Sequence, residues 1–257
     1  MVLQVKKACK NFGGLSALSD VSFSINQGEI FGLIGPNGAG KTTMFNLITS
    51  LFTPTSGEII FNEDNINGLK PHLITKKGIC RTFQNIRLFP QMTAEENVMV
   101  GEHCRSKSGV FSSVFRTKSQ RKEEERIRSK ANELLEFVGL GGFAEVVSDS
   151  LAYGQQRRLE IARALASSPQ LLLLDEPAAG MNETETSELF HLIKKIQEQG
   201  ITVLLIEHDM PLVMKLCDRI AVLNFGKKIA EGTPAEIQNN SDVIEAYLGS
   251  EEEDLYA

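Results

Sequence analysis

The chain has 257 residues, 42% hydrophobic and 23% charged, which is enough to bury the core of one large domain. Its net charge of −6 gives no general attraction to nucleic acid, so we expect no nucleic-acid partner. The four cysteines are scattered and form no C-x-x-C pair, which favours thiols in a reducing compartment. No apolar run approaches the ~18–20 residues that span a bilayer, so any membrane association should come from partners.

The first part of the chain, residues 1–62, is rich in strand and turn signals. Apolar and polar residues alternate over 21–25, as in a half-buried strand. Residues 30–34 form a continuous apolar run that predicts a buried strand leading into a glycine-rich loop. The spacing predicts a helix over 43–51 and a further strand over 57–61.

The composition becomes charged and helical between about residues 85 and 150. Thr93 and Glu96 have the spacing of a capping box, which predicts the start of a helix. Residues 105–130 are strongly basic and then of mixed charge. This stretch is compatible with a solvated loop and helix face, or with contact to anionic lipid.

From residue 151 onward, strands and helices alternate with short links. The predicted strands are 171–175, 202–206 and 219–224. Four apolar residues mark one face of the helix between the first two, and Gly200 is suited to its C-terminal end. This alternation predicts a mostly parallel sheet, and we expect the acidic end, 251–254, to fray.

A glycine-rich loop, Gly35–Thr42, fits the phosphate-binding pattern G-x-x-x-x-G-K-[ST] between a predicted strand and a predicted helix. Its glycines allow consecutive backbone N–H groups to surround phosphate groups. Lys41 supplies positive charge to the β- and γ-phosphates, and the Thr42 hydroxyl is a ligand for Mg²⁺. The loop therefore predicts a nucleoside triphosphate such as ATP, together with Mg²⁺.

Two carboxylates follow the apolar run at 171–174. Asp175 and Glu176 would stand at the end of a buried strand beside the glycine-rich loop. We expect Asp175 to hold the metal through its coordination shell. We expect Glu176 to act as the general base that activates the attacking water.

The segment that begins at Leu151 resembles the signature motif of ABC ATPases, and it lies just ahead of the Asp175–Glu176 strand, as in that family. The signature residues, which the family uses in trans, are Leu151, Ala152, Tyr153, Gly154 and Gln155. The resemblance implies that Phe12 stacks on adenine, that Gln84 senses the metal and water, and that His208 is the switch histidine. It also places a dimer-contact loop at 178–182.

The resemblance implies an α/β fold. A P-loop NTPase core with a mostly parallel sheet is joined by an N-terminal antiparallel β part and a helical lobe carrying the signature. One ABC ATPase domain would cover 1–257, with the core at 1–84 and 160–257 and the lobe at 85–159. The implied nucleotide-binding residues are Phe12, Gly35, Pro36, Asn37, Gly38, Ala39, Gly40, Lys41, Thr42 and Thr43. The implied catalytic residues are Glu176, His208 and Gln84, and the implied metal residues are Thr42, Gln84 and Asp175.

The sequence departs from the usual family pattern at two places. Ala152 replaces the signature serine, which removes one donor to the γ-phosphate, and Asn182 replaces the aspartate of the dimer-contact loop. The surrounding strings, from Tyr153 and from Glu176, are similar to those of the branched-chain amino-acid uptake ATPases of bacteria and archaea. The prediction of the transported solute rests on this resemblance alone.

Three other classes fit less well. A P-loop kinase or GTPase would need an acceptor site or an N-K-x-D motif, which 224–227 does not supply. A soluble ABC ATPase of DNA repair or translation would carry a coiled coil or a second cassette, and a non-catalytic ABC subunit would lack Lys41 or Glu176.

The resemblance implies partners as well as chemistry. It implies a second ABC ATPase chain in a homodimer or heterodimer, transmembrane permease subunits and, indirectly, a solute-binding protein. The expected location is the cytoplasmic face of the cell membrane.

Overall fold

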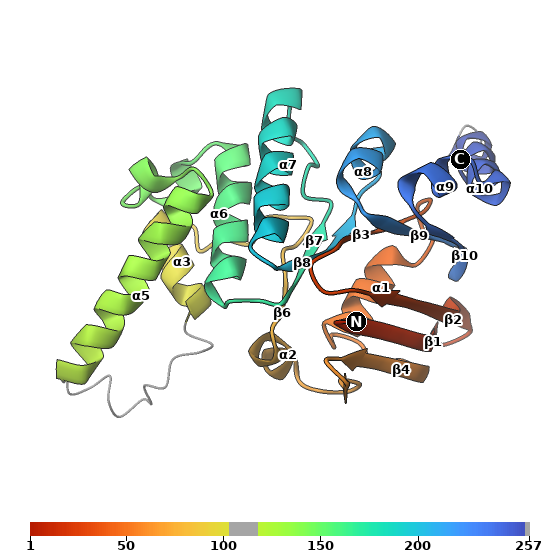
Figure 1. Ribbon diagram of the computed structural model, residues 1–257, viewed down its shortest axis with the longest axis horizontal. Helices are drawn as coiled ribbons and strands as arrows, with labels where there is room; N and C mark the ends of the chain where they lie inside the picture. Colours follow the sequence, from red (N-terminus) through yellow and green to blue (C-terminus); the bar gives the residue numbers. More distant parts are fainter. Residues whose placement is uncertain (103–117, 255–257) are drawn as a thin grey trace.

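The computed structural model describes residues 1–102 and 118–254, where the strands build two sheets (Figure 1). In the four-stranded antiparallel sheet the order is β2-β1-β4-β5. Its strands are β1 (Leu3–Phe12), β2 (Leu15–Ile25), β4 (Ser56–Phe61) and β5 (Asp64–Asn65). This sheet is the N-terminal antiparallel β part that the resemblance implies.

The six-stranded sheet has the order β10-β9-β3-β8-β7-β6. Its strands are β3 (Ile30–Ile34), β6 (Ile79–Arg81), β7 (Leu171–Asp175), β8 (Thr202–Ile206), β9 (Arg219–Asn224) and β10 (Lys227–Gly232). The neighbouring pairs from β9 to β6 are parallel, and β10 pairs antiparallel with β9 at one edge. The expected α/β fold with a mostly parallel sheet is confirmed.

Helices surround this sheet and extend to one side of it (Figure 1). They are α1 (Lys41–Ile48), α2 (Pro71–Lys77), α3 (Ala94–Glu102), α5 (Lys118–Phe137), α6 (Tyr153–Ala166), α7 (Glu183–Glu198), α8 (Met210–Leu216), α9 (Pro234–Gln238) and α10 (Ser241–Asp254). Helices α3, α5 and α6 pack against one another at the end of the molecule away from α10.

The core has two parts, one on each face of the large sheet, because successive side chains of a strand point to opposite faces. On β7, Leu171 and Leu173 pack with α1 and the antiparallel sheet. Leu172 and Leu174 pack with α6 to α8 on the other face. All four are fully buried, so β7 is covered on both of its faces.

The strand predictions agree with the structure, whereas one predicted helix differs at both of its ends. The helix expected over 43–51 begins at Lys41 and ends at Ile48, and Ser50 has a left-handed backbone with φ of 57°. Residues 251–254 belong to the last turn of α10, and the prediction that this end frays stays a prediction. The capping box is confirmed, since the backbone N–H of Thr93 donates to Glu96 and that of Glu96 donates to the Thr93 hydroxyl.

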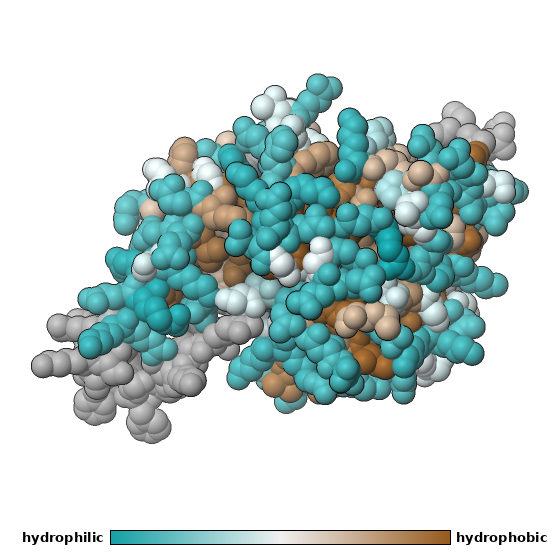
Figure 2. Space-filling view, viewed as in Figure 1, coloured by the Kyte–Doolittle hydropathy of each residue, from teal (hydrophilic) through white to brown (hydrophobic). Residues whose placement is uncertain are grey.

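The face shown in Figure 2 is largely hydrophilic, with hydrophobic atoms in patches between the elements. Within the described residues, no helix combines the length and the apolar character that a membrane crossing requires. The basic stretch can be followed only in part, because residues 105–117 lie outside the described residues.

Candidate functional site

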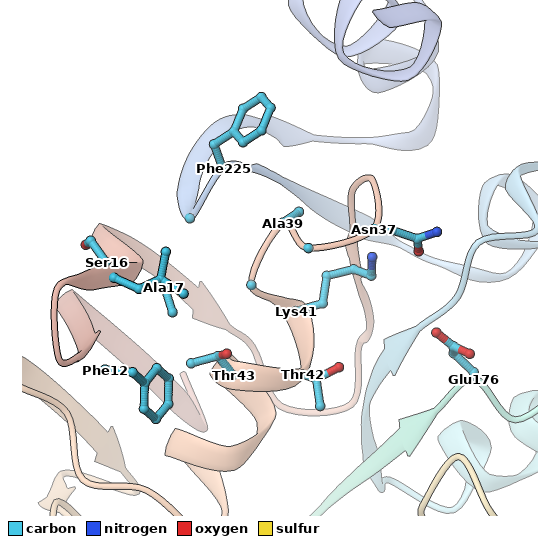
Figure 3. A pocket seen from close by; sticks show the side chains of 14 residues that line it. Phe12, Ser16, Ala17, Asn37, Ala39, Lys41, Thr42, Thr43, Glu176 and Phe225 are labelled. Atoms are coloured by element: carbon cyan, nitrogen blue, oxygen red, sulfur yellow. The ribbon is translucent and has the colours of Figure 1, made fainter. Parts of the chain in front are cut away.

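A cavity of about 470 Å³ opens beside the glycine-rich loop (Figure 3). Its lining comes from the end of β1, the start of β2, the loop with the start of α1, the residue after β7 and the β9–β10 turn. The lining residues are Phe12, Leu15, Ser16, Ala17, Asn37, Gly38, Ala39, Gly40, Lys41, Thr42, Thr43, Glu176, Phe225 and Gly226. The structure therefore brings Phe12, most of the predicted loop and Glu176 together around one space.

The loop is held by close contacts between backbones, which only glycine permits. At Gly35, where φ is 147°, an added Cβ would lie 2.0 Å from the carbonyl oxygen of Leu223. At Gly40, where φ is 102°, it would lie 2.8 Å from the carbonyl oxygen of Ala17. The β9–β10 turn adds a hydrogen bond from Gly226 N–H to the Ala39 carbonyl at 3.1 Å. The loop is thus fixed in shape by its neighbours.

Lys41 folds back over its own loop. Its ammonium donates to the carbonyl oxygens of Gly35 at 2.6 Å and Pro36 at 2.9 Å. Burial lowers the pKa of Lys41, and the nearby carboxylates of Glu176 and Asp175 oppose this effect. A buried cation that bonds only to carbonyl groups is suited to receive an anion.

Glu176 lies at the end of β7 in a left-handed backbone conformation, with φ of 46°. Such a conformation costs of order 1–3 kcal/mol for a residue other than glycine, and it is typical of active sites. The carboxylate accepts a hydrogen bond from Gln84 Nε2 at 2.6 Å and lies 3.4 Å from Nδ1 of His208. Three residues predicted from distant parts of the sequence therefore meet at one carboxylate.

Asp175, one residue earlier, is buried and forms an ion pair with Arg81 at 2.6 Å. In the described residues, no three His, Cys, Asp or Glu side chains gather in a way that could hold a metal. A metal here would therefore depend on other oxygen donors, such as a hydroxyl and phosphate groups.

The signature residues Leu151–Gln155 are absent from the lining of the cavity, as far as the described residues show. They lie just before and at the start of α6, where Ala152 is the N-cap and has no side-chain oxygen to accept from the first amides. Gln155 accepts from the Ala152 N–H at 3.0 Å, so only half of a capping box is present. The first backbone N–H groups of α6 are consequently left without a side-chain cap.

A buried ion pair connects α6 to the segment that contains Gln84. Arg157 and Glu160, 0% and 1% exposed, lie 2.9 Å apart. Arg157 also donates to the carbonyl oxygens of Phe83 and Gln84, at 2.6 and 2.7 Å, and Glu160 accepts from the Arg87 N–H. Burial raises the pKa of Glu160, and Arg157 opposes it. The start of α6 and the Gln84 segment are therefore mechanically joined.

The loop at 178–182 is fixed at both ends. Glu207, buried beside His208, accepts from the Ala178 N–H at 2.9 Å. Asn182 caps α7, because its side chain accepts from the Glu185 N–H and Glu185 accepts from the Asn182 N–H. Asparagine caps a helix as well as aspartate does, so this departure from the family pattern retains the capping role.

Phe12 is 41% exposed, and its ring meets Phe52 edge-on with 5.2 Å between centroids. The Lys10 ammonium lies 5.1 Å from the Phe12 centroid. One side of the Phe12 ring system is thus supported while the residue still lines the cavity, beyond Thr43 in Figure 3.

Sequence reasoning missed several residues that shape this site. Phe225 lines the cavity although it is 79% exposed, and the turn signal at Gly226 could have indicated a loop there. Arg157 and Glu207 are charged residues that are buried, and no sequence pattern indicates their burial. Arg81 lies on the strand that precedes Gln84, and only the three-dimensional structure shows that Asp175 is its partner.

Comparison with known proteins places this geometry in a family. The sequence model of the family "ABC transporter" matches residues 18–179. The sequence model of the family "Branched-chain amino acid ATP-binding cassette transporter" matches residues 227–253. The high-affinity branched-chain amino acid transport ATP-binding protein BraF of Pseudomonas aeruginosa is 47% identical over 249 residues, which cover 96% of this chain and 98% of that protein.

Two solved structures extend the comparison. The ADP conformation of MJ1267, an ATP-binding cassette of an ABC transporter, has a TM-score of 0.84 at 34% identity, covering 96% of this chain and 98% of the other. A dimeric post-hydrolysis state of the cassette MJ0796, bound to ADP and Pi, has a TM-score of 0.76 at 31% identity, covering 90% and 98%.

The chain therefore belongs to the ABC transporter family, as an ATP-binding cassette. It is an ATP-hydrolysing enzyme that binds adenine nucleotide.

The glycine contacts yield a first prediction. Gly35→Ala places a methyl group against the Leu223 carbonyl, so the loop must shift. A misplacement of about 1 Å in a site can lower the activity of an enzyme by ~10²-fold. We expect ATP affinity, measured by fluorescent nucleotide titration, to fall by about tenfold or more. Gly200→Ala is the matched control, because φ is also positive there (81°) but nothing lies within 4 Å of the added Cβ. Equal ATP affinities in the two variants would contradict this account of the loop.

Proposed function

We propose that this chain hydrolyses ATP to drive the uptake of branched-chain amino acids through membrane permease subunits. The main support is Glu176, whose carboxylate is held by Gln84 and His208 at the rim of the P-loop cavity. A carboxylate in that position can take a proton from water that attacks a phosphate bound over Lys41.

Nucleotide binding would use the loop Gly35–Thr43 for the phosphates and Phe12 for the adenine. The fixed backbone presents its N–H groups without reorganisation, and α1 begins at the loop with its positive dipole end. Lys41 would exchange its bonds to loop carbonyls for bonds to the β- and γ-phosphates. An aromatic ring supported on one side, as Phe12 is, can stack on a base with the other.

The residues present fit Mg²⁺, which prefers oxygen ligands and usually binds through one or two protein groups plus phosphate oxygens. The Thr42 hydroxyl, the Asp175 carboxylate and the Gln84 amide are such groups. The ion, when bound, supplies neutralisation of the phosphate charge.

For hydrolysis, Glu176 is the general base. Gln84 donates to one of its oxygens and His208 lies beside the other, so the carboxylate cannot rotate freely. That arrangement orients the carboxylate of the base. The orientation also depends on the positions of two segments, the Gln84 segment and the loop after β8. His208 is 58% exposed and remains accessible to a γ-phosphate.

A second ATPase chain would complete the site. The open N–H groups at the start of α6, with Leu151–Gln155, would face the γ-phosphate on the partner. We propose the division into a core, 1–84 and 160–257, and a helical lobe, 85–159. Movement of the lobe would pass through the Arg157–Glu160 link to Gln84 and then, through residues 88–90, to a permease.

The relatives and the C-terminal family match support branched-chain amino acids as the solute. Permease subunits would hold the chain at the cytoplasmic face of the cell membrane, and a solute-binding protein would deliver the amino acid to them. The second cassette would be either another copy or a different chain.

Removal of the proposed base tests the chemistry. Glu176→Gln keeps size and the hydrogen bond from Gln84 but cannot accept a proton, so ATPase activity should fall by ~10²–10⁴-fold. Binding of ATP with Mg²⁺ should remain near the parental affinity. Glu198→Gln, at the exposed end of α7, is the matched control and should hydrolyse ATP normally. Parental turnover in Glu176→Gln would show that another group is the base.

Transport assays test the solute. Cells that lack this chain should take up labelled leucine, isoleucine and valine more slowly, and the intact chain should restore uptake. Lys41→Ala should fail to restore it, because the phosphates lose their positive partner. If uptake of these three amino acids is unchanged while that of another solute falls, the proposed substrate is wrong and the ATPase function stands.

A further inference from the structure

Arg81 is a buried arginine whose contacts extend beyond those of an ordinary ion pair. Its side chain is 7% exposed, and one terminal nitrogen donates to Oδ2 of Asp175 at 2.6 Å. The other terminal nitrogen donates to Oδ1 of Asn46, also at 2.6 Å. Its Nε has no hydrogen-bond partner among the described residues, so the two-pronged end of the guanidinium takes all of its hydrogen bonds.

Aromatic rings fix the plane of this guanidinium. Its central carbon lies 5.4 Å from the centroid of Phe45 and 5.2 Å from that of Phe83. Phe83 also lies under Arg87, at 4.4 Å. A planar group that is held by rings and bonded at both prongs has little freedom to turn.

Arg81 and its two hydrogen-bonding partners come from three elements, and each element carries or leads into a group proposed for the metal. Asn46 lies on α1, which contains Thr42. Asp175 ends β7, and Arg81 itself ends β6, three residues before Gln84. One guanidinium thus ties together the three places from which metal-binding oxygens would come.

We propose that Arg81 is a positioning residue that orients Asp175 toward the metal accompanying ATP. It holds Oδ2, which leaves Oδ1 of Asp175 for the metal's coordination shell. Because Arg81 belongs to the strand that leads into Gln84, the metal site senses the position of that segment. This inference rests on the proposed metal role of Asp175.

The test measures the affinity of the protein for Mn²⁺ in the presence of an ATP analogue that is not hydrolysed. The EPR signal of free Mn²⁺ reports how much of the ion is unbound. Arg81→Lys keeps the charge but cannot bridge both partners, and Arg81→Gln removes the charge. Loss of a hydrogen-bonding partner of a ligating carboxylate typically costs about 10–100-fold in metal affinity, which is the weakening expected for Arg81→Gln. A smaller loss is expected for Arg81→Lys, with analogue affinity in EDTA unchanged.

Two further variants control the experiment. Arg219→Lys alters another arginine that lies over a phenylalanine ring and pairs with carboxylates, and it should leave Mn²⁺ affinity unchanged. Asn46→Ala removes the second partner of Arg81 and should weaken Mn²⁺ binding in the same direction. It carries the test if the Arg81 variants do not fold.

Parental or tighter Mn²⁺ binding in Arg81→Lys and Arg81→Gln overturns the inference, as does parental binding in Asn46→Ala when the Arg81 variants fail to fold. Tighter binding would mean that the guanidinium competes with the metal. Asp175→Asn separates this failure from that of the proposed function. If it too binds Mn²⁺ normally, then Asp175 is not a metal residue at all.

Discussion

The close approach of the P-loop backbone to the neighbouring strands is the constraint on which the site depends. Gly35 touches the end of β9, Gly40 touches the start of β2, and Gly226 bonds to Ala39. These contacts fix the loop before any ligand binds, so its N–H groups need no reorganisation to receive phosphate. Lys41 is placed by the same constraint, because the carbonyl groups that hold its ammonium belong to the loop.

Charged residues connect this fixed loop to parts of the chain that could move. Arg157 and Glu160 join α6 to the Gln84 segment, and Arg81 joins that segment to Asp175. Buried ion pairs contribute little net stability, because desolvation offsets most of their attraction. Breaking one is costly, however, so such pairs specify geometry. Movement of the helical part would therefore be felt at both carboxylates that end β7.

The sequence predicted the parts of the site that depend on local pattern. The loop glycines, the apolar run of β7 and its two terminal acids form a pattern that is readable without a structure. The helix start at Thr93 was also readable, because capping is local. The end of α1 was not, since Ser50 adopts a left-handed backbone that its residue type does not announce.

Long-range partners could not be predicted in the same way. The contacts of Arg81 with Asp175 and of Glu207 with Ala178 join residues far apart in sequence, and isolated charges usually lie on the surface. Phe225 was missed because an exposed aromatic in a turn carries no pattern of its own. Asn182 was interpreted as a departure from the family, whereas the structure gives it an ordinary capping role.

We propose that two chains share each site, with the start of α6 facing the partner's nucleotide. The test is the molecular mass in solution, measured by light scattering with ATP present. It compares the Glu176→Gln protein with two double variants that carry, in addition, Asp or Asn in place of the uncapped Ala152. Asp and Asn cap a helix about equally well, but only Asp adds a negative charge. We predict a dimer with ATP but not ADP, retained in Ala152→Asn and lost in Ala152→Asp. If a different cassette co-purifies, the measurement applies to that pair. Equal dimerisation of the two variants, or none by the background protein with ATP, would contradict the shared site.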